Sequence, residues 1–244
     1  MAALAGKRAL ITGGATGIGW GIATALASLG CQVALAGRRE DKLREAADCW
    51  SGTPGMLVHP ADVADRASVQ QLFAWAAQQL GPIDILVCSA GMNIKNRMLH
   101  EMRPEQWDEV MAVNATGVYN CLYSVLPQMR ERQDGIIFIV SSVSGKRAAP
   151  LGGVAYNASK FAVTGLGVSA WTEEAPHGIR ITNIYPGEVD TPILEHRPQP
   201  VSAERRATML RPEDVGAMVA AIAQLPPHAH VPELVIKPTS QAYV

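Results

Sequence analysis

Short apolar runs alternate with longer helical segments along most of this 244-residue chain. The runs are apolar almost throughout, which indicates strands buried on both faces of a parallel sheet that helices cover. Predicted strands span 8–12, 32–36, 56–59, 84–90, 135–142, 180–185 and 233–237. Helical spacing covers about 17–29, 41–49, 65–80, 104–132 (one helix or two pieces), 156–174 and 212–224. This order predicts an α/β fold with a doubly wound, parallel seven-stranded sheet and helices on both faces.

The length permits one large or two small domains, and α/β folds often use such a length for one domain. We therefore expect a single domain over residues 1–244. The least regular region, about 190–210, is proline-rich and charged and follows a strand end. Ligands bind at the carboxyl ends of the strands in such sheets, so this region is a candidate substrate lid. Its charged residues are expected to be solvated rather than to hold substrate: His196, Arg197, Arg205 and Arg206.

Composition argues against several other classes of protein. The net charge is −1 and no basic stripe is present, so no nucleic-acid partner is expected. No apolar run reaches the roughly 18–20 residues that a membrane helix needs, and the N-terminus does not resemble a signal peptide. The cysteines are too scattered for a zinc site or a disulfide framework, so we expect no metal, no membrane partner and a cytoplasmic protein. They are Cys31, Cys49, Cys88 and Cys121.

A glycine cluster, "TGGATGIG" at 12–19, lies between the first predicted strand and the first helix. Gly13 permits a sharp turn, Gly17 allows a pyrophosphate to approach the backbone, and Gly19 allows the helix to pack closely on the sheet. Glycines also make ordinary turns, but the strand before and the helix after favour nucleotide binding at the helix N-terminus. The cluster thus predicts a Rossmann-type dinucleotide site.

Further segments follow in a fixed order: "CSAG" (88–91), "VNATG" (113–117), "IVSSVSG" (139–145), "YNASK" (156–160) and "YPGEVDT" (185–191). Together with the glycine cluster, whose spacing is G-x-x-x-G-x-G, they resemble the motifs of the short-chain dehydrogenase/reductase family of the classical type. The resemblance extends over essentially the whole chain. It implies a nicotinamide-dependent oxidoreductase that acts on a small-molecule carbonyl or alcohol.

The resemblance also implies which residues would hold the cofactor. Asp62 is assigned to the adenine amino group and Val63 to the wall of the adenine pocket, although Asp62 could equally be a helix cap near Ala64. The remaining residues implied to bind the cofactor are Gly13, Ala15, Thr16, Gly17, Ile18, Gly19, Ala90, Gly91, Pro186, Gly187, Val189 and Thr191, together with Tyr156 and Lys160.

The residues after the second strand favour NADP(H) over NAD(H). A carboxylate there would bind the ribose hydroxyls and repel a 2′-phosphate, but this chain has Gly37 followed by Arg38 and Arg39. A guanidinium can hold a phosphate through two parallel hydrogen bonds. The alternative is that the two arginines are only a solvated strand end. Thr16 stands where many NADP-using relatives carry a further basic residue, so no second charge is available there.

Tyr156 and Lys160 are four residues apart in a predicted helix, so their side chains share one face. Free tyrosine has a pKa of about 10 and lysine of about 10.4. A protonated Lys160 is expected to favour the phenolate and lower the pKa of Tyr156, and the positive nicotinamide of an oxidised cofactor would act in the same direction. Tyr156 could then exchange a proton with a carbonyl or hydroxyl. Lys160 could also hold the nicotinamide ribose.

Ser142 is expected to bind the substrate oxygen from a strand end, while Ser141 should face the other way. Ser142 and Tyr156 are 14 residues apart, one more than is usual in the family, which places an extra residue in the loop 146–155. Asn114 is a poor helix former within a predicted helix. The resemblance implies a helix distortion there, with the Asn114 carbonyl holding a water that passes protons to Lys160. Otherwise Asn114 is a solvated helix residue.

Two other functional classes fit the same fold: a non-catalytic NADP(H) sensor, and a lyase or epimerase. Sensors usually lack the tyrosine or lysine, and the lyase and epimerase relatives are often longer, with a C-terminal substrate domain. "CSAG" replaces the family's asparagine pair with Cys88 and Ser89, so the usual side-chain support of the central sheet must be rebuilt or missing. The resemblance further implies a homodimer or homotetramer. The substrate is not readable, although loops 92–97, 146–151 and 191–210 should shape its pocket.

Overall fold

The computed structural model describes residues 3–242 and shows one sheet of seven parallel strands in this part of the chain, in the order β3-β2-β1-β4-β5-β6-β7. The strands are β1 (Arg8–Thr12), β2 (Gln32–Gly37), β3 (Leu57–Pro60), β4 (Ile85–Cys88), β5 (Gly135–Val140), β6 (Ile179–Pro186) and β7 (Glu233–Ile236). The helices are α1 (Gly17–Ser28), α2 (Glu40–Cys49), α3 (Arg66–Gln79), α4 (Pro104–Met111), α5 (Gly117–Arg132), α6 (Val154–Glu174), α7 (Ala203–Ala207) and α8 (Pro212–Ala223). The predicted α/β fold is confirmed.

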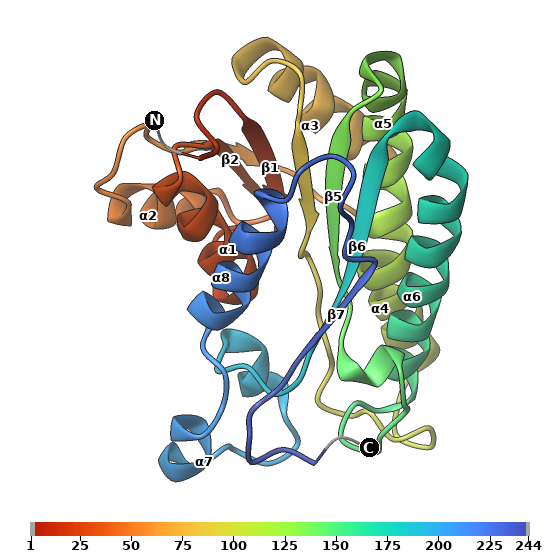
Figure 1. The fold of residues 1–244 in the computed structure, drawn as a ribbon. Coiled ribbons are helices and arrows are strands. Elements are labelled where there is room, and N and C mark those ends of the chain that lie inside the picture. The colour runs from red at the N-terminus through yellow and green to blue at the C-terminus, as the bar shows by residue number, and fades with distance from the viewer. Residues whose placement is uncertain (1–2, 243–244) are drawn as a thin grey trace.

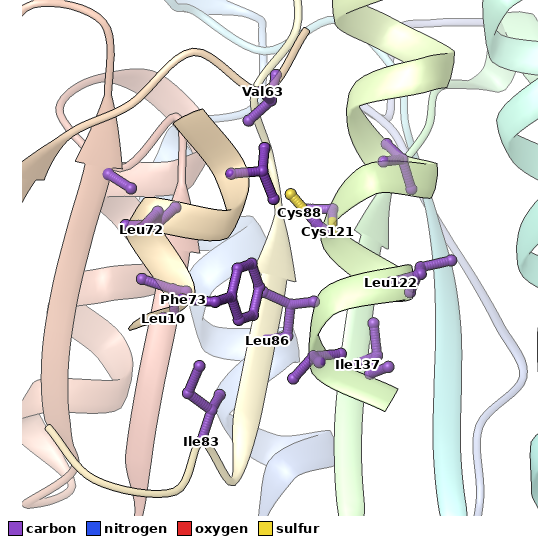
Figure 2. Packing of buried hydrophobic residues seen from close by; sticks show 14 of the residues in the cluster. Leu10, Val63, Leu72, Phe73, Ile83, Leu86, Cys88, Cys121, Leu122 and Ile137 are labelled. Atoms are coloured by element: carbon purple, nitrogen blue, oxygen red, sulfur yellow. The ribbon is translucent and has the colours of Figure 1, made fainter. Parts of the chain in front are cut away.

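Helices cover both faces of the sheet (Figure 1). Helices α1, α2 and α8 lie on one face, and α3, α4, α5 and α6 lie on the other (Figure 1). Neighbouring strand residues enter opposite cores, because successive side chains of a strand point to opposite faces. Thus Leu10 and Leu86 pack with α3 and α5 (Figure 2), whereas Ile11 and Val87 pack with α1 and α8. Burial on both faces explains why these strands are apolar throughout.

The strand order places the turn after β1 next to the end of β4. Strand β1 pairs with β2 on one side and with β4 on the other, so the chain changes direction across the sheet at this point. The carboxyl ends of β1 and β4 therefore open a crevice between loops that lead to opposite faces. Ligands of doubly wound sheets bind at such a switch point.

Two strands end two residues earlier than the sequence predicted, and both corrections concern the crevice; β7 ends one residue earlier, at Ile236. The strand expected at 84–90 ends at Cys88, and the one expected at 135–142 ends at Val140. The residues that follow, 89–91 and 141–142, leave the sheet and line the crevice. The first residue after each strand still donates a backbone hydrogen bond to a neighbouring strand, Ser89 to Thr12 at 3.2 Å and Ser141 to Ile184 at 2.8 Å, so the ends of these strands are gradual.

The long helical region at 104–132 consists of two α-helices joined by a π-helical turn at Ala112–Thr116. The lid region contains a 3-10 turn at Pro192–His196 and the short helix α7. Within residues 3–242, no helix has both the length and the apolar character required to cross a membrane.

Candidate active site

A cleft of about 840 Å³ opens at the carboxyl ends of the strands. Its walls come from the turns that follow β1 to β6, from the start of α6 and from the lid region. Of the predicted cofactor and catalytic residues, all but Gly19 and Asn114 line it. The lining set is Gly13, Ala15, Thr16, Gly17, Ile18, Arg38, Arg39, Asp62, Val63, Ala90, Gly91, Ser142, Tyr156, Lys160, Pro186, Gly187, Val189 and Thr191.

The glycine turn brings three backbone segments into close contact. Gly13 has a φ of 68°, and a Cβ there would lie 2.7 Å from the backbone nitrogen of Ala90, so a side chain is excluded both by conformation and by space. A Cβ at Gly19 would collide with the carbonyl oxygen of Gly13. Gly19 therefore does not face the cleft; it lets α1 begin directly beneath the turn.

The start of α1 has the properties of an anion site. Thr16 occupies the N-cap position but makes no side-chain capping hydrogen bond, and the first turn contains no acidic residue. The N–H groups of the first turn have no partner within the helix, and the helix dipole is positive at this end. This end of the cleft therefore fits a pyrophosphate.

The far end of the cleft carries two arginines and one carboxylate. Arg38 and Arg39 are exposed, line the cleft, and form no ion pair within the described part of the chain. Asp62 accepts a hydrogen bond from the N–H of Ala64 at 3.0 Å through one carboxylate oxygen, Oδ1. Asp62 thus caps a turn and lines the cleft, whereas the N-cap of α3 is Asp65, which accepts from the N–H of Ala67, so the expected helix cap at Asp62 is wrong.

Helix α6 carries Tyr156 and Lys160 into the other end of the cleft. The Lys160 ammonium lies 5.5 Å from the centre of the Tyr156 ring and donates a hydrogen bond to the carbonyl of Val140 at 2.9 Å. The Lys160 side chain is only 5% exposed, and this burial lowers its pKa to about 8. Lys160 is therefore enclosed by protein, and Tyr156 is half-buried in the wall of the cleft.

The expected net lowering of the Tyr156 pKa is wrong for the protein alone. Burial raises the pKa of Tyr156, and the Ser142 hydroxyl and the Arg97 charge oppose this rise only in part. The physical reason is that removing the phenolate from water destabilises it more than Ser142 and Arg97 stabilise it. Lys160 does not reverse the balance, since its ammonium is directed at the Val140 carbonyl and is itself desolvated.

The two serines after β5 have different partners. The Ser141 hydroxyl donates to the Lys160 carbonyl at 3.2 Å and lies 3.3 Å from the Thr164 hydroxyl, so it fixes the backbone of α6. The Ser142 hydroxyl accepts from the Ser144 N–H at 3.1 Å, and it acts to lower the pKa of Tyr156. Ser142 is thus the serine beside the tyrosine, as the strand pattern predicted.

Asn114 lies in the π-helical turn, where the resemblance implied a helix distortion. Its side chain is 1% exposed and links two elements of the site. The amide oxygen accepts from the Met92 N–H at 2.8 Å, and the amide nitrogen donates to the Met92 carbonyl at 2.9 Å and to the Ser159 hydroxyl at 3.0 Å. Asn114 therefore positions the turn after β4 against α6, and it is not a solvated residue.

Arg97 is a cleft residue that the sequence did not single out. Only its loop, 92–97, was expected near the substrate. The guanidinium is 5% exposed and donates to the carbonyls of Ile94, Leu151 and His196 at 3.0, 2.6 and 2.6 Å. These acceptors come from three segments far apart in the chain, so no local pattern could have revealed them.

The expectation of solvated lid charges is wrong for Arg197. Its side chain is 16% exposed and donates to Glu188 at 2.9 Å, and Arg205 pairs with the other oxygen of the same carboxylate. Arg206 pairs with Asp190 at 2.8 Å. The lid is thus held to the segment after β6 by ion pairs, and only His196 among the four residues is free of a carboxylate partner within residues 3–242.

Cys88 replaces the polar support of the central sheet with apolar packing. Its side chain is 2% exposed and lies beside that of Cys121 from α5 (Figure 2). Cys121 and burial together raise the pKa of the Cys88 thiol well above its usual value, and both thiols are free. Among the described residues, no group of three or more histidine, cysteine, aspartate or glutamate side chains is placed to hold a metal.

Comparison with known proteins decides the family, because residues 7–201 match the short chain dehydrogenase family. The chain belongs to this family. Its relatives include a glycine betaine reductase of Emericella nidulans, which is 34% identical over 98% of this chain. That protein is much longer, and the match covers only 19% of it. An uncharacterized oxidoreductase of Staphylococcus aureus (strain USA300) is 32% identical, over 98% of this chain and 100% of that protein.

Solved short-chain dehydrogenases share the fold over nearly their whole length. An alcohol dehydrogenase from Thermococcus sibiricus, complexed with 5-hydroxy-NADP, is 28% identical with a TM-score of 0.87 and covers 97% of this chain and 98% of its own. A serine dehydrogenase complexed with NADP+ is also 28% identical, has a TM-score of 0.88 and covers 97% and 96%. The protein is therefore a Rossmann-type member of an oxidoreductase family, and both of these solved relatives are complexed with NADP+ or an NADP derivative.

Proposed function

We propose that this short-chain dehydrogenase is an NADP(H)-dependent oxidoreductase that interconverts a carbonyl and an alcohol. The observation that carries the proposal is one continuous cleft with two kinds of ends. One end presents the uncapped start of α1 and the unpaired Arg38 and Arg39. The other end presents Tyr156 and Ser142 above the buried Lys160. A single domain over 1–244 would then carry both cofactor binding and catalysis.

The residues present fit NADP(H) at the level of the donor set. The N–H groups at the start of α1 would hold the pyrophosphate, and the two arginines would hold the 2′-phosphate. Asp62 and Val63 would flank the adenine. Lys160 would hold the nicotinamide ribose through its ammonium hydrogens. Bound NADPH supplies the hydride, and the protein orients the two reactants.

The pKa directions favour Tyr156 as the proton donor in carbonyl reduction. Burial raises its pKa, so the phenol keeps its proton at neutral pH and can transfer it to the substrate oxygen. The Ser142 hydroxyl would donate to the same oxygen as negative charge develops there. Lys160, with its pKa near 8, would take part in restoring the proton, and Asn114 would hold the surrounding backbone and a relay water.

The test is the decrease of NADPH absorbance with a panel of aldehydes and ketones. We expect NADPH oxidation with at least one carbonyl, a large loss in Tyr156→Phe, and unchanged NADPH binding by that variant, because the phenol hydroxyl moves the proton while the ring keeps its packing. Binding of NADPH with no turnover of any carbonyl would favour the sensor. A reaction that proceeds with no net NADPH oxidation would favour the lyase or epimerase.

We also propose that the protein forms a homodimer or homotetramer through α5 and α6. Large apolar side chains on these helices are exposed: Tyr119, Tyr123, Phe161 and Val168. Exposed apolar surface of this kind commonly marks an interface. Sedimentation would test this, and a monomer at micromolar concentration would refute it. The free cysteines are consistent with a reducing, cytoplasmic location, which cell fractionation would test.

A further inference from the structure

Arg97 is a buried cation on the substrate side of the cleft. It lies between β4 and α4, lines the cleft together with Tyr156 and Ser142, and is 5% exposed. Its charge lowers the pKa of Tyr156, which places the guanidinium within electrostatic reach of the phenol. Three backbone carbonyls accept its hydrogen bonds, but no carboxylate pairs with it anywhere in residues 3–242.

The other cations on this side of the cleft are already neutralised. Glu188 pairs with both Arg197 and Arg205, and Asp190 pairs with Arg206. Arg97 is next to this cluster, because it donates to the carbonyl of His196, yet it has no share in either carboxylate. Burial and repulsion from Arg197 lower the pKa of Arg97, so both destabilise its charged form. A buried charge is usually paired.

A purely structural role accounts for only part of this arrangement. The three carbonyl contacts connect the loop after β4, the loop before α6 and the lid, so Arg97 holds these segments together. Of the five N–H donors of a guanidinium, the three contacts leave two without a protein partner in residues 3–242. Two N–H donors and a full positive charge match one carboxylate.

We infer that the substrate carries a carboxylate, which Arg97 binds while Tyr156 and Ser142 bind the reacting oxygen. The inference rests on the proposed oxidoreductase function and assigns it a substrate class, a carbonyl compound with a free acid group and its hydroxy-acid counterpart. Arg97 is then the residue that selects an acid over a neutral molecule of the same shape. Because it also holds the carbonyl of His196, the carboxylate is bound where the lid meets the loops.

The first experiment compares acids with their methyl esters in NADPH-dependent reduction. The pairs are acetoacetate with methyl acetoacetate, and 4-oxobutanoate with methyl 4-oxobutanoate. We expect the wild type to prefer the acid of at least one pair. In Arg97→Gln the ratio of kcat/KM for acid over ester should fall about 10- to 100-fold, the effect of losing a charge-assisted hydrogen bond. Arg97→Lys should retain part of the ratio.

The ratio separates recognition from structural damage. A looser lid, a shifted Tyr156 pKa or a less stable fold affects acid and ester alike and cancels in the ratio. Arg103→Gln is the matched control, because it removes the same charge from a side chain that is 74% exposed and outside the cleft. It should leave the ratio unchanged. A wild type that prefers every ester, or an Arg97→Gln ratio equal to wild type, would overturn the inference.

A second experiment needs no turnover. The melting temperature of the NADP+ complex is measured with propionate and with propionamide at constant ionic strength. Propionate should raise it in the wild type and in Arg103→Gln but not in Arg97→Gln, and propionamide should have no effect. If propionate and propionamide act alike, the carboxylate site is wrong. If no carbonyl is reduced but the propionate effect depends on Arg97, the oxidoreductase proposal fails and the carboxylate site stands.

Discussion

Replacing Lys160 by methionine should abolish NADPH oxidation and yet remove a folding penalty at neutral pH. Burial lowers the pKa of Lys160 from 10.5 to about 8. Below pH 8 the folded and unfolded chains both carry the proton, so the whole cost of burying the ammonium is present. At about 1.4 kcal/mol per pKa unit, this cost is about 3 kcal/mol. The variant is free of this penalty, although the Val140 carbonyl, now without a hydrogen bond, destabilises it by about 1 kcal/mol or more.

The pH dependence of this effect has a defined sign. Between about pH 8 and 10.5 the folded protein releases the Lys160 proton while the unfolded chain retains it, so the unfolded state binds more protons and wild-type stability rises with pH. Above 10.5 neither state carries the proton and the penalty is gone. From pH 7 to pH 9.5 the wild type should therefore gain about 2 kcal/mol relative to Lys160→Met.

Urea unfolding of both proteins at pH 7 and pH 9.5, without added cofactor, measures this gain. Other titrating groups are common to the two proteins and cancel in the comparison. The raised pKa of Tyr156 keeps its proton in place over this range. A stability difference that is the same at both pH values, within about 0.5 kcal/mol, would show that burial does not destabilise the Lys160 ammonium, and the reasoning would fail.

Four further substitutions have expected outcomes. Arg38→Ala should raise the Kd for NADPH about 10- to 100-fold and leave that for NADH nearly unchanged, as measured by fluorescence titration; an equal effect on both would contradict the 2′-phosphate assignment. Gly19→Ala should destroy NADPH binding, because its Cβ would collide with the carbonyl oxygen of Gly13 in the glycine turn. At Gly165 a Cβ would meet nothing within 4 Å, so Gly165→Ala should stabilise α6 by about 0.5–1 kcal/mol. Arg130→Met should lower the free energy of unfolding, because it leaves the Glu174 carboxylate, 1% exposed, without its partner; unchanged stability in urea unfolding would contradict this.

The sequence predicted the elements that burial dictates. Strands with apolar residues on both faces and helices with regular apolar spacing leave a local pattern, so β1 and α1 start at the predicted residues. Helix α6 begins at Val154 rather than at 156, because Gly153, with a φ of 78°, turns the chain into the helix two residues earlier. Such a start depends on the backbone conformation of one glycine and leaves little periodic signal.

The same distinction holds for the candidate site. The predicted cofactor residues fall within short motifs, so the sequence could name them together, and all of them except Gly19 line one cleft. Arg97 and Glu188 could not be found in this way. Each acts through partners that are close only after folding, three carbonyls for Arg97 and two arginines for Glu188. The sequence also did not predict that Cys88 packs with Cys121 where the family has its asparagine pair, because the two cysteines are distant in the chain.

One cause, burial, moves the pKa values of Tyr156 and Lys160 in opposite directions. It raises the pKa of the phenol and lowers that of the ammonium, and in both residues it favours the neutral form. The expectation that Lys160 lowers the Tyr156 pKa treated the pair as if it were isolated from the rest of the site. In the half-buried Tyr156 the raised pKa favours the protonated phenol, which suits the proposed role as a proton donor. Charges brought by ligands would then decide the reverse reaction: a positive nicotinamide ring favours the phenolate, and a carboxylate bound at Arg97 opposes it. If both proposals hold, oxidation of a hydroxy acid should need a higher pH than reduction of the matching oxo acid, and Arg97→Gln should alter that difference.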